Sequence, residues 1–231
     1  MPTTHLDLCK QLVEDAGISG TFTSVVNQTG EFKRVVNWII RATTEVEGIW
    51  FDWDFLHNFH TFATTIGVSD YPAPANHNLW DVATGKIPAD EMNLDYWMWT
   101  RKKYDSTALA AGDPYAFTVL PDKSLRLYDT PTSIKTLSFE YWNIPTVLAA
   151  NADEPAIPVQ FRDIIVSKAL QFYANYESAD EVKSQALEQF TVRLRQLESH
   201  SAPSRQARDS INTGADIVVS ADDEYGDGYG Y

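Results

Sequence analysis

The hydrophobic positions repeat with a helical period at both ends of the chain and with a strand period in between. Residues 30–50 carry mostly apolar side chains at i, i+3, i+4 and i+7, which predicts a helix with one buried face. A shorter helix is predicted at residues 3–15, with Thr4 as N-cap and Asp7 in its first turn. The face of the longer helix consists of Phe32, Val35, Val36, Ile39, Ile40, Thr43, Glu47 and Trp50.

From residue 56 the period changes to two, which is typical of strands. Residues 56–68 alternate and are rich in aromatic and β-branched side chains. Gly85, Pro88 and Gly112 interrupt the pattern that follows, and tight turns between the later strands predict an antiparallel meander. The further strands are expected at residues 79–82, 92–100, 115–119, 124–128 and 136–142.

Helical periodicity returns at Pro158, which suits the first position of a helix. A capping box of Ser178 and Glu181 predicts the start of a second helix, so the two form a helical hairpin. Their apolar faces consist of Phe161, Ile164, Ile165, Ala169, Phe172 and Tyr176, then Val182, Ala186, Phe190, Leu194 and Leu197.

These patterns together predict an α+β fold with three parts. Residues 1–54 and 155–200 are expected to form a helical bundle, and residues 55–154 a central antiparallel, sandwich-like β-rich subdomain. Residues 201–231 lose all periodicity except at Ile217, Val218 and Val219, and their polar composition predicts an extended C-terminal arm that orders on a partner.

Composition and charge narrow the possible functions. The net charge of −14 argues against sequence-independent binding to nucleic acid, which requires clustered Lys and Arg. The single cysteine, Cys9, lies on an apolar helix face and is expected to be a buried structural thiol. The N-terminal residues have neither a basic region nor an apolar run, so no signal peptide is expected, and no membrane span either. From these two expectations we predict that the protein folds in a cytosol.

Candidate chemistry is sparse. His57 and His60 are three apart on a predicted strand and should face opposite ways, which does not suit a shared metal. Carboxylate pairs such as Asp153 and Glu154 are interpreted as turn or surface residues, because an acidic chain contains many by chance. No phosphate-binding loop or nucleophile motif is present, so neither an enzyme nor a cofactor is expected. Tyr96, Trp97 and Trp99 could bind sugars, or they could lie on a strand with their rings in the β core or in a subunit contact, and we favour the second interpretation.

Three motifs resemble those of a known family. They are L-x-L-Y-x-T-P at residues 125–131, F-E-Y-W-x-x-P at 139–145 and I-P-x-x-F-R-D-I-I-V at 157–166, preceded by an aromatic block at 51–56. In order and spacing they resemble the head-to-tail adaptor proteins of tailed bacteriophages, of the podovirus tail tubular protein A-like type.

The resemblance implies a structural virion protein of the phage neck, assembled in the host cytoplasm. It implies a dodecameric ring beneath the portal protein that extends the DNA channel, lets genomic DNA pass without specific binding, and offers a platform for tail nozzle or tube proteins. The arm at 201–231 would then dock on the portal. Its predicted contact residues are Ile217, Val218, Val219, Tyr225, Tyr229 and Tyr231.

Two alternatives stay open from the sequence. The aromatic and acidic content also suits a carbohydrate-binding or carbohydrate-cleaving module. A tail-terminator or other neck protein would differ from an adaptor in location and ring size rather than in chemistry.

Overall fold

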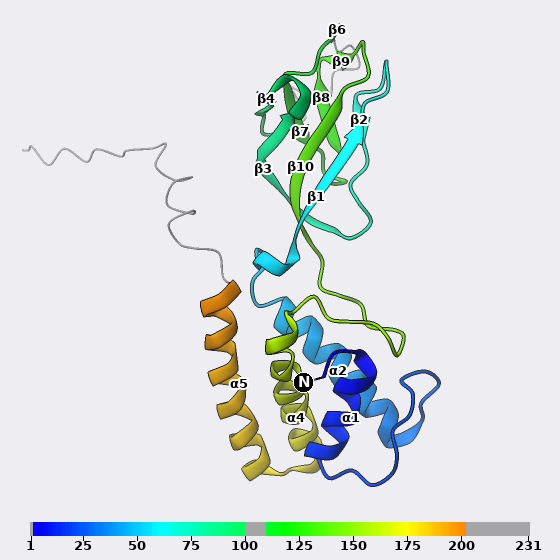
Figure 1. Cartoon of the computed structure of the whole chain (residues 1–231), viewed down its shortest axis with the longest axis vertical. Helices are drawn as coiled ribbons and strands as arrows, with labels where there is room; N and C mark the ends of the chain where they lie inside the picture. The colour runs from blue at the N-terminus through cyan, green and yellow to red at the C-terminus, as the bar shows by residue number, and fades with distance from the viewer. Residues whose placement is uncertain (1, 100–109, 202–231) are drawn as a thin grey trace, which may run out of the picture.

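Helices and strands occupy opposite ends of the molecule. The computed structural model describes residues 2–99 and 110–201, and Figure 1 shows the helices packed together at one end and the β unit at the other. Helices from both ends of the described sequence pack on one another, whereas the antiparallel sheets come from its middle, so the predicted α+β fold is confirmed. None of the helices in the described ranges is long and apolar enough to cross a membrane.

The first two helices begin where the sequence predicts. The N-cap of α1 (His5–Asp15) is Thr4, whose Oγ1 accepts the Asp7 N–H at 3.3 Å while the Asp7 carboxylate accepts the Thr4 N–H at 3.3 Å. The second helix, α2 (Gly30–Glu47), ends at a C-cap glycine, so it is shorter than its periodicity suggests.

The C-terminal helices form the predicted packed pair, but the residues at which they begin differ from those predicted from the sequence. Pro158 precedes a short 3₁₀ turn, η3 (Val159–Phe161), and α4 (Asp163–Glu177) begins only after it. Ser178 has a φ of 58° and caps the end of α4, so the predicted capping box is wrong because an N-cap residue needs an extended backbone. The last helix is α5 (Asp180–Ser201).

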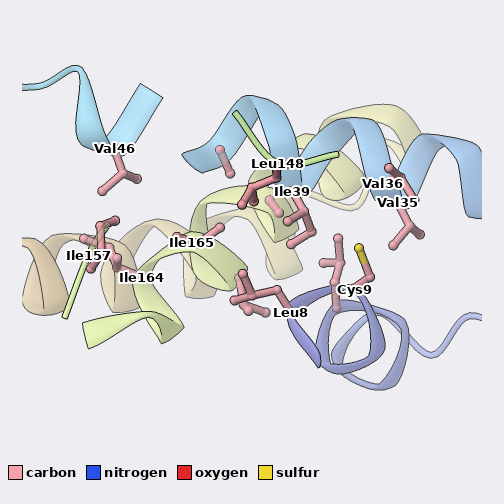
Figure 2. Packing of buried hydrophobic residues seen from close by; sticks show 14 of the residues in the cluster. Leu8, Cys9, Val35, Val36, Ile39, Val46, Leu148, Ile157, Ile164 and Ile165 are labelled. Carbon is pink, nitrogen blue, oxygen red and sulfur yellow. The ribbon is translucent and has the colours of Figure 1, made fainter. Parts of the chain in front are cut away.

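The helices share one hydrophobic core. Figure 2 shows Leu8 and Cys9 of α1, Ile39 of α2 and Ile165 of α4 close together within it. Cys9 is fully buried, which confirms its predicted structural role, and burial raises the pKa of its thiol to about 12. The loop between α1 and α2, where the sequence showed little pattern, adds Ile18, Phe22 and Val25 to this core.

The β unit contains two four-stranded sheets. The first has the order β1-β10-β3-β4 and is antiparallel throughout, with β1 (His57–Ala63), β10 (Thr136–Asn143), β3 (His77–Ile87) and β4 (Met92–Asn93). The second has the order β2-β8-β7-β5, with β2 (Asp70–Tyr71), β8 (Leu125–Tyr128), β7 (Ala116–Val119) and β5 (Asp95–Tyr96). A further short pair joins β6 (Ala111–Gly112) to β9 (Thr130–Pro131), and short 3₁₀ turns lie at η1 (Asp54–Leu56) and η2 (Pro88–Asp90).

The strand connections correct two sequence-based expectations. β7 and β8 form an antiparallel hairpin, but β10 leaves it to pair with β1 and β3, so the predicted meander is wrong. Gly85 lies inside β3 rather than interrupting it. The rings of Phe117 and Phe139 pack edge to face next to Gly85, and the lack of a side chain at this position allows them to approach the strand closely.

Candidate partner-binding surfaces

An extended segment at residues 144–157, here called the strap, connects β10 to η3 along the helical body (Figure 1). Glu47 at the end of α2 binds the strap through hydrogen bonds from within the helical body. Its carboxylate oxygens accept the backbone N–H of Thr146 at 2.5 Å and of Ala156 at 2.9 Å. Glu47 is fully buried, and this burial raises the pKa of its carboxyl although the hydrogen bonds oppose the shift.

A second buried charge, Arg162, binds the C-terminal end of the strap, at residues 154–157. Its guanidinium donates to the carbonyls of Ile157 at 2.9 Å and Pro155 at 3.0 Å, to the Glu154 carboxylate at 2.9 Å, and to the Thr3 carbonyl. Only a planar fork of several donors serves so many acceptors at once. Arg162 belongs to the motif at residues 157–166, but no pattern in the neighbouring sequence predicted that its side chain binds the strap.

The middle of the strap is tied to the N-terminal segments. The main-chain N–H of His5 donates to the Asp153 carbonyl at 2.8 Å, and Asn151 Oδ1 accepts the Val25 N–H at 2.7 Å. The Asp153 carboxylate accepts the N–H groups of Ala150 and Ala149, both at 2.6 Å, and these bonds lower its pKa. The strap is therefore a fixed part of the helical body.

A groove of about 340 Å³ lies beside the strap, lined by residues that include Leu56, Asn143, Pro145 and Ala156. On its rim, Ile144 and Val147 are 41% and 75% exposed. Exposed apolar side chains of this kind are a feature of surfaces that bind other proteins.

An aromatic row crosses from the end of α2 to β1. Ring centroids are 6.3 Å apart for Phe51 and Trp142, 5.4 Å for Trp142 and His57, and 5.5 Å for His57 and Phe59. Phe51 and Phe59 are 50% and 63% exposed. These solvent-exposed aromatic rings form a second apolar surface, close to the junction of the helices and the β unit.

The side chains singled out for chemistry have structural contacts. His57 Nε2 lies 3.0 Å from the Glu140 carboxylate, whereas the His60 ring packs near Trp80 and Tyr141 at 5.8 and 6.5 Å. Burial lowers the pKa of His60. In residues 2–99 and 110–201, no group of three His, Cys, Asp or Glu side chains could hold a metal ion.

The aromatic residues considered for sugar binding belong to the β unit. The Trp97 ring packs on Tyr128 at 5.1 Å and on Tyr115 at 5.5 Å, and Trp99 packs against the same small cluster. These contacts agree with the interpretation of the rings as part of the β core.

The predicted portal-contact residues lie outside the described residues. They are Ile217, Val218, Val219, Tyr225, Tyr229 and Tyr231. The end of α5, from which the arm continues, is described: Trp50 Nε1 donates to Glu198 at 3.2 Å, and the His200 ring lies 5.0 Å from that of Phe161. The arm therefore begins where α5 meets the segment between α2 and η1.

The surfaces described so far suit binding to other proteins, which is the property of a structural adaptor. The chain matches the family model of the SU10 adaptor protein over residues 3–215. It therefore belongs to this family of bacteriophage adaptor proteins, as the sequence motifs indicated. Family membership implies a non-enzymatic role and interaction with other virion proteins. No match was found among curated proteins.

Proposed function

We propose that this protein is the head-to-tail adaptor of its phage, forming a dodecameric ring beneath the portal. The ring extends the DNA channel and presents a platform for tail nozzle or tube proteins. The observation that carries this proposal is the match to the adaptor family along residues 3–215. The net charge of −14 of the whole chain is compatible with a wall that DNA slides past without binding.

We assign a part of this role to each part of the chain. Residues 1–54 and 155–200 form the portal-docking and ring domain, residues 55–154 the tail-facing domain, and residues 201–231 the arm that docks on the portal. Two hydrophobic clusters support the division between helices and strands, because one joins the helices and the other the strands. The strap belongs to the helical cluster, so its residues 144–154 pack with the ring domain rather than with the strands of the tail-facing domain. In the assembled ring, many copies multiply a modest affinity of each arm.

Removal of the arm tests this assignment. A chain ending at Ser201 keeps every described helix and strand, so it should fold, and circular dichroism and thermal unfolding check that it does. We expect it to lose attachment to purified portal-bearing heads of the same phage, measured by co-sedimentation and electron microscopy. Substituting Tyr225, Tyr229 and Tyr231 by Ala should weaken attachment with the arm length unchanged. Normal attachment of the truncated chain would show that the arm is not the docking element.

A further inference from the structure

The sheet formed by β1, β10, β3 and β4 buries one face and exposes the other. Phe139, Tyr141 and Trp80 point inward, into the hydrophobic cluster that joins the strands. Successive side chains of a strand point to opposite faces. Trp142 of β10 and Leu79 of β3, which lie opposite each other, therefore share the outer face, where Leu79 is 45% exposed.

The aromatic row lies on this outer face. In the pairing of β1 with β10, His57 lies opposite Trp142 and Phe59 lies opposite Glu140. Phe59 is 63% exposed, and Phe51, which packs edge to face on Trp142, is 50% exposed. Large apolar side chains gathered on one exposed face commonly mark a surface that another segment or protein covers.

Two carboxylates lie beside these rings. Glu140 has Phe59 of β1 on one side and Asp81 of β3 on the other, so the two acidic residues are direct neighbours across the strands. Like charges in this position repel and destabilise a sheet, and a bound cation relieves the repulsion. The outer face therefore suits a segment that brings positive charge and also packs on aromatic rings.

Arginine meets both requirements, because its guanidinium group stacks on aromatic rings and pairs with carboxylates. The same chain makes this contact elsewhere. The guanidinium carbon of Arg34 lies 4.4 Å from the ring centroid of Tyr176, and that of Arg41 lies 4.4 Å from the ring centroid of Phe172.

The arm leaves the helical body close to this face. The end of α5 points towards the β unit in Figure 1, and Ser201, its last residue, is 3% exposed. Trp50 Nε1 donates to Glu198 in the last turn of α5, and Phe51, the first ring of the aromatic row, follows Trp50 in the chain. The arm therefore starts beside the row.

The first residues of the arm are basic, and the others are acidic. Arg205 and Arg208 are the two basic residues of the arm, whereas residues 209–231 contain six carboxylate side chains and no Lys or Arg. An extended chain covers about 3.3 Å per residue, so Arg205 lies within roughly 13 Å of Ser201 and Arg208 within roughly 23 Å. The family model also continues past α5, to residue 215. The part of the arm that can reach the acidic, aromatic face thus carries the complementary charge.

We propose that residues 202–208 bind the outer face of this sheet in the same chain. Arg205 packs on the rings of Phe51 and Trp142, and Arg208 packs on Phe59 and pairs with Glu140. Because the arm is tethered beside the face, its effective concentration is high and weak contacts are sufficient. This inference goes beyond the proposed function, since it concerns the isolated chain and leaves residues 209–231 available for the portal.

A nitroxide spin label at Ala207→Cys in the full-length chain tests the contact by nuclear magnetic resonance. The native Cys9 stays unlabelled because it is buried and its pKa is raised to about 12. We expect the label to broaden the amide signals of residues 57–61 in β1 and 140–142 in β10. Leu187 is the internal control, because it is 52% exposed and lies roughly 21 Å along α5 from Ser201. An arm with no preferred contact would approach Leu187 as often as β1, so equal broadening at both places would overturn the proposal.

Charge reversal in the arm gives a second readout. Arg205→Glu combined with Arg208→Glu should abolish the broadening in β1, whereas Asp222→Lys combined with Asp223→Lys should leave it unchanged. Broadening that survives the first pair of substitutions would contradict the role of the two arginines.

A mixed sample distinguishes contacts within one chain from contacts between chains. Spin-labelled chains are mixed with separate isotope-labelled chains, and we expect no broadening in the latter. Broadening there would show that a second copy supplies the arm, which overturns the assignment to the same chain. None of these outcomes changes the proposed docking on the portal, which is tested separately with heads.

Discussion

At the scale of single residues, two buried charges determine where the strap lies. Glu47 and Arg162 are 0% and 7% exposed, and both make their hydrogen bonds mainly to backbone groups of the strap. A buried charge is stable only when its hydrogen-bonding capacity is used. The strap supplies these partners, so its conformation and the two charges depend on each other.

Glu47→Ala should lower the free energy of unfolding by about 2 kcal/mol, because the part-buried N–H of Thr146 loses its acceptor and that of Ala156 keeps only the Thr146 hydroxyl, 3.2 Å away. Glu45→Ala in the same helix is the control. Glu45 pairs at the surface with Arg41 and Lys168, so its loss should cost less than about 1 kcal/mol. Urea unfolding measures both, and equal costs would contradict the role given to Glu47.

His77 should make stability depend on pH. Its pKa is lowered to about 4, first by burial, then by the positive charge of Lys123 and by His60. As the pH falls below 6.5, the unfolded chain therefore binds a proton at His77, whereas the folded chain binds it only near pH 4. The stability of the folded chain is therefore not reduced by His77 above pH 6.5, and it falls as the pH is lowered from 6.5 towards 4.

His77→Phe keeps a ring against Trp80 and Tyr141 but removes the titration. Between pH 7.5 and 4, the wild-type chain should lose up to about 3 kcal/mol more stability than this variant. Chemical unfolding at several pH values measures the difference. Parallel pH profiles for the two chains would refute it.

At the scale of elements, the long strand β3 depends on the absence of a side chain at one position. A Cβ at Gly85 would lie 2.7 Å from the Phe139 ring and 2.8 Å from the Phe117 ring. Both rings are fully buried and have no room to move away.

Gly85→Ala should therefore destabilise the β unit by about 1–3 kcal/mol. Gly112→Ala provides the comparison, since its Cβ would meet the Asp129 carboxylate at 3.0 Å, and a side chain of this kind can turn aside. Thermal unfolding should show a clear drop for the first variant and a smaller one for the second. The reverse order would mean that the two rings move apart at little cost.

At the scale of the whole molecule, the helices and the strands lie at opposite ends (Figure 1), and each end has its own large hydrophobic cluster. The chain passes between them at η1 and again at the strap. Local packing within each cluster should therefore govern the local stability of its own elements.

Ile39→Ala and Phe139→Ala test this separation, because the first removes a fully buried side chain from the helical cluster and the second from the β cluster. Each should cost roughly 2–5 kcal/mol. Amide hydrogen exchange should accelerate mainly in the helices for Ile39→Ala and mainly in the strands for Phe139→Ala. Acceleration spread evenly over both ends would show that the chain opens as one unit.

The sequence by itself determined the local elements and the family. The capped start of α1, the buried face of α2 and the hairpin strands β7 and β8 follow from periodicity, side-chain caps and turn residues within a few positions. The adaptor motifs were equally readable, because they are contiguous short blocks, and the match over residues 3–215 confirms the family to which they pointed. The sequence also placed Glu47 on an apolar helix face, which was the one local sign of its buried role.

Only the tertiary structure decided which segments meet. The pairing of β10 with β1 and β3, the need for glycine at position 85, and the left-handed Ser178 depend on contacts or chain directions that no short window contains. Glu47 and Thr146 are 99 positions apart, yet one hydrogen bond joins them. Periodicity reports which side of a segment is buried, whereas the partner on that side is selected by the packing of the whole chain.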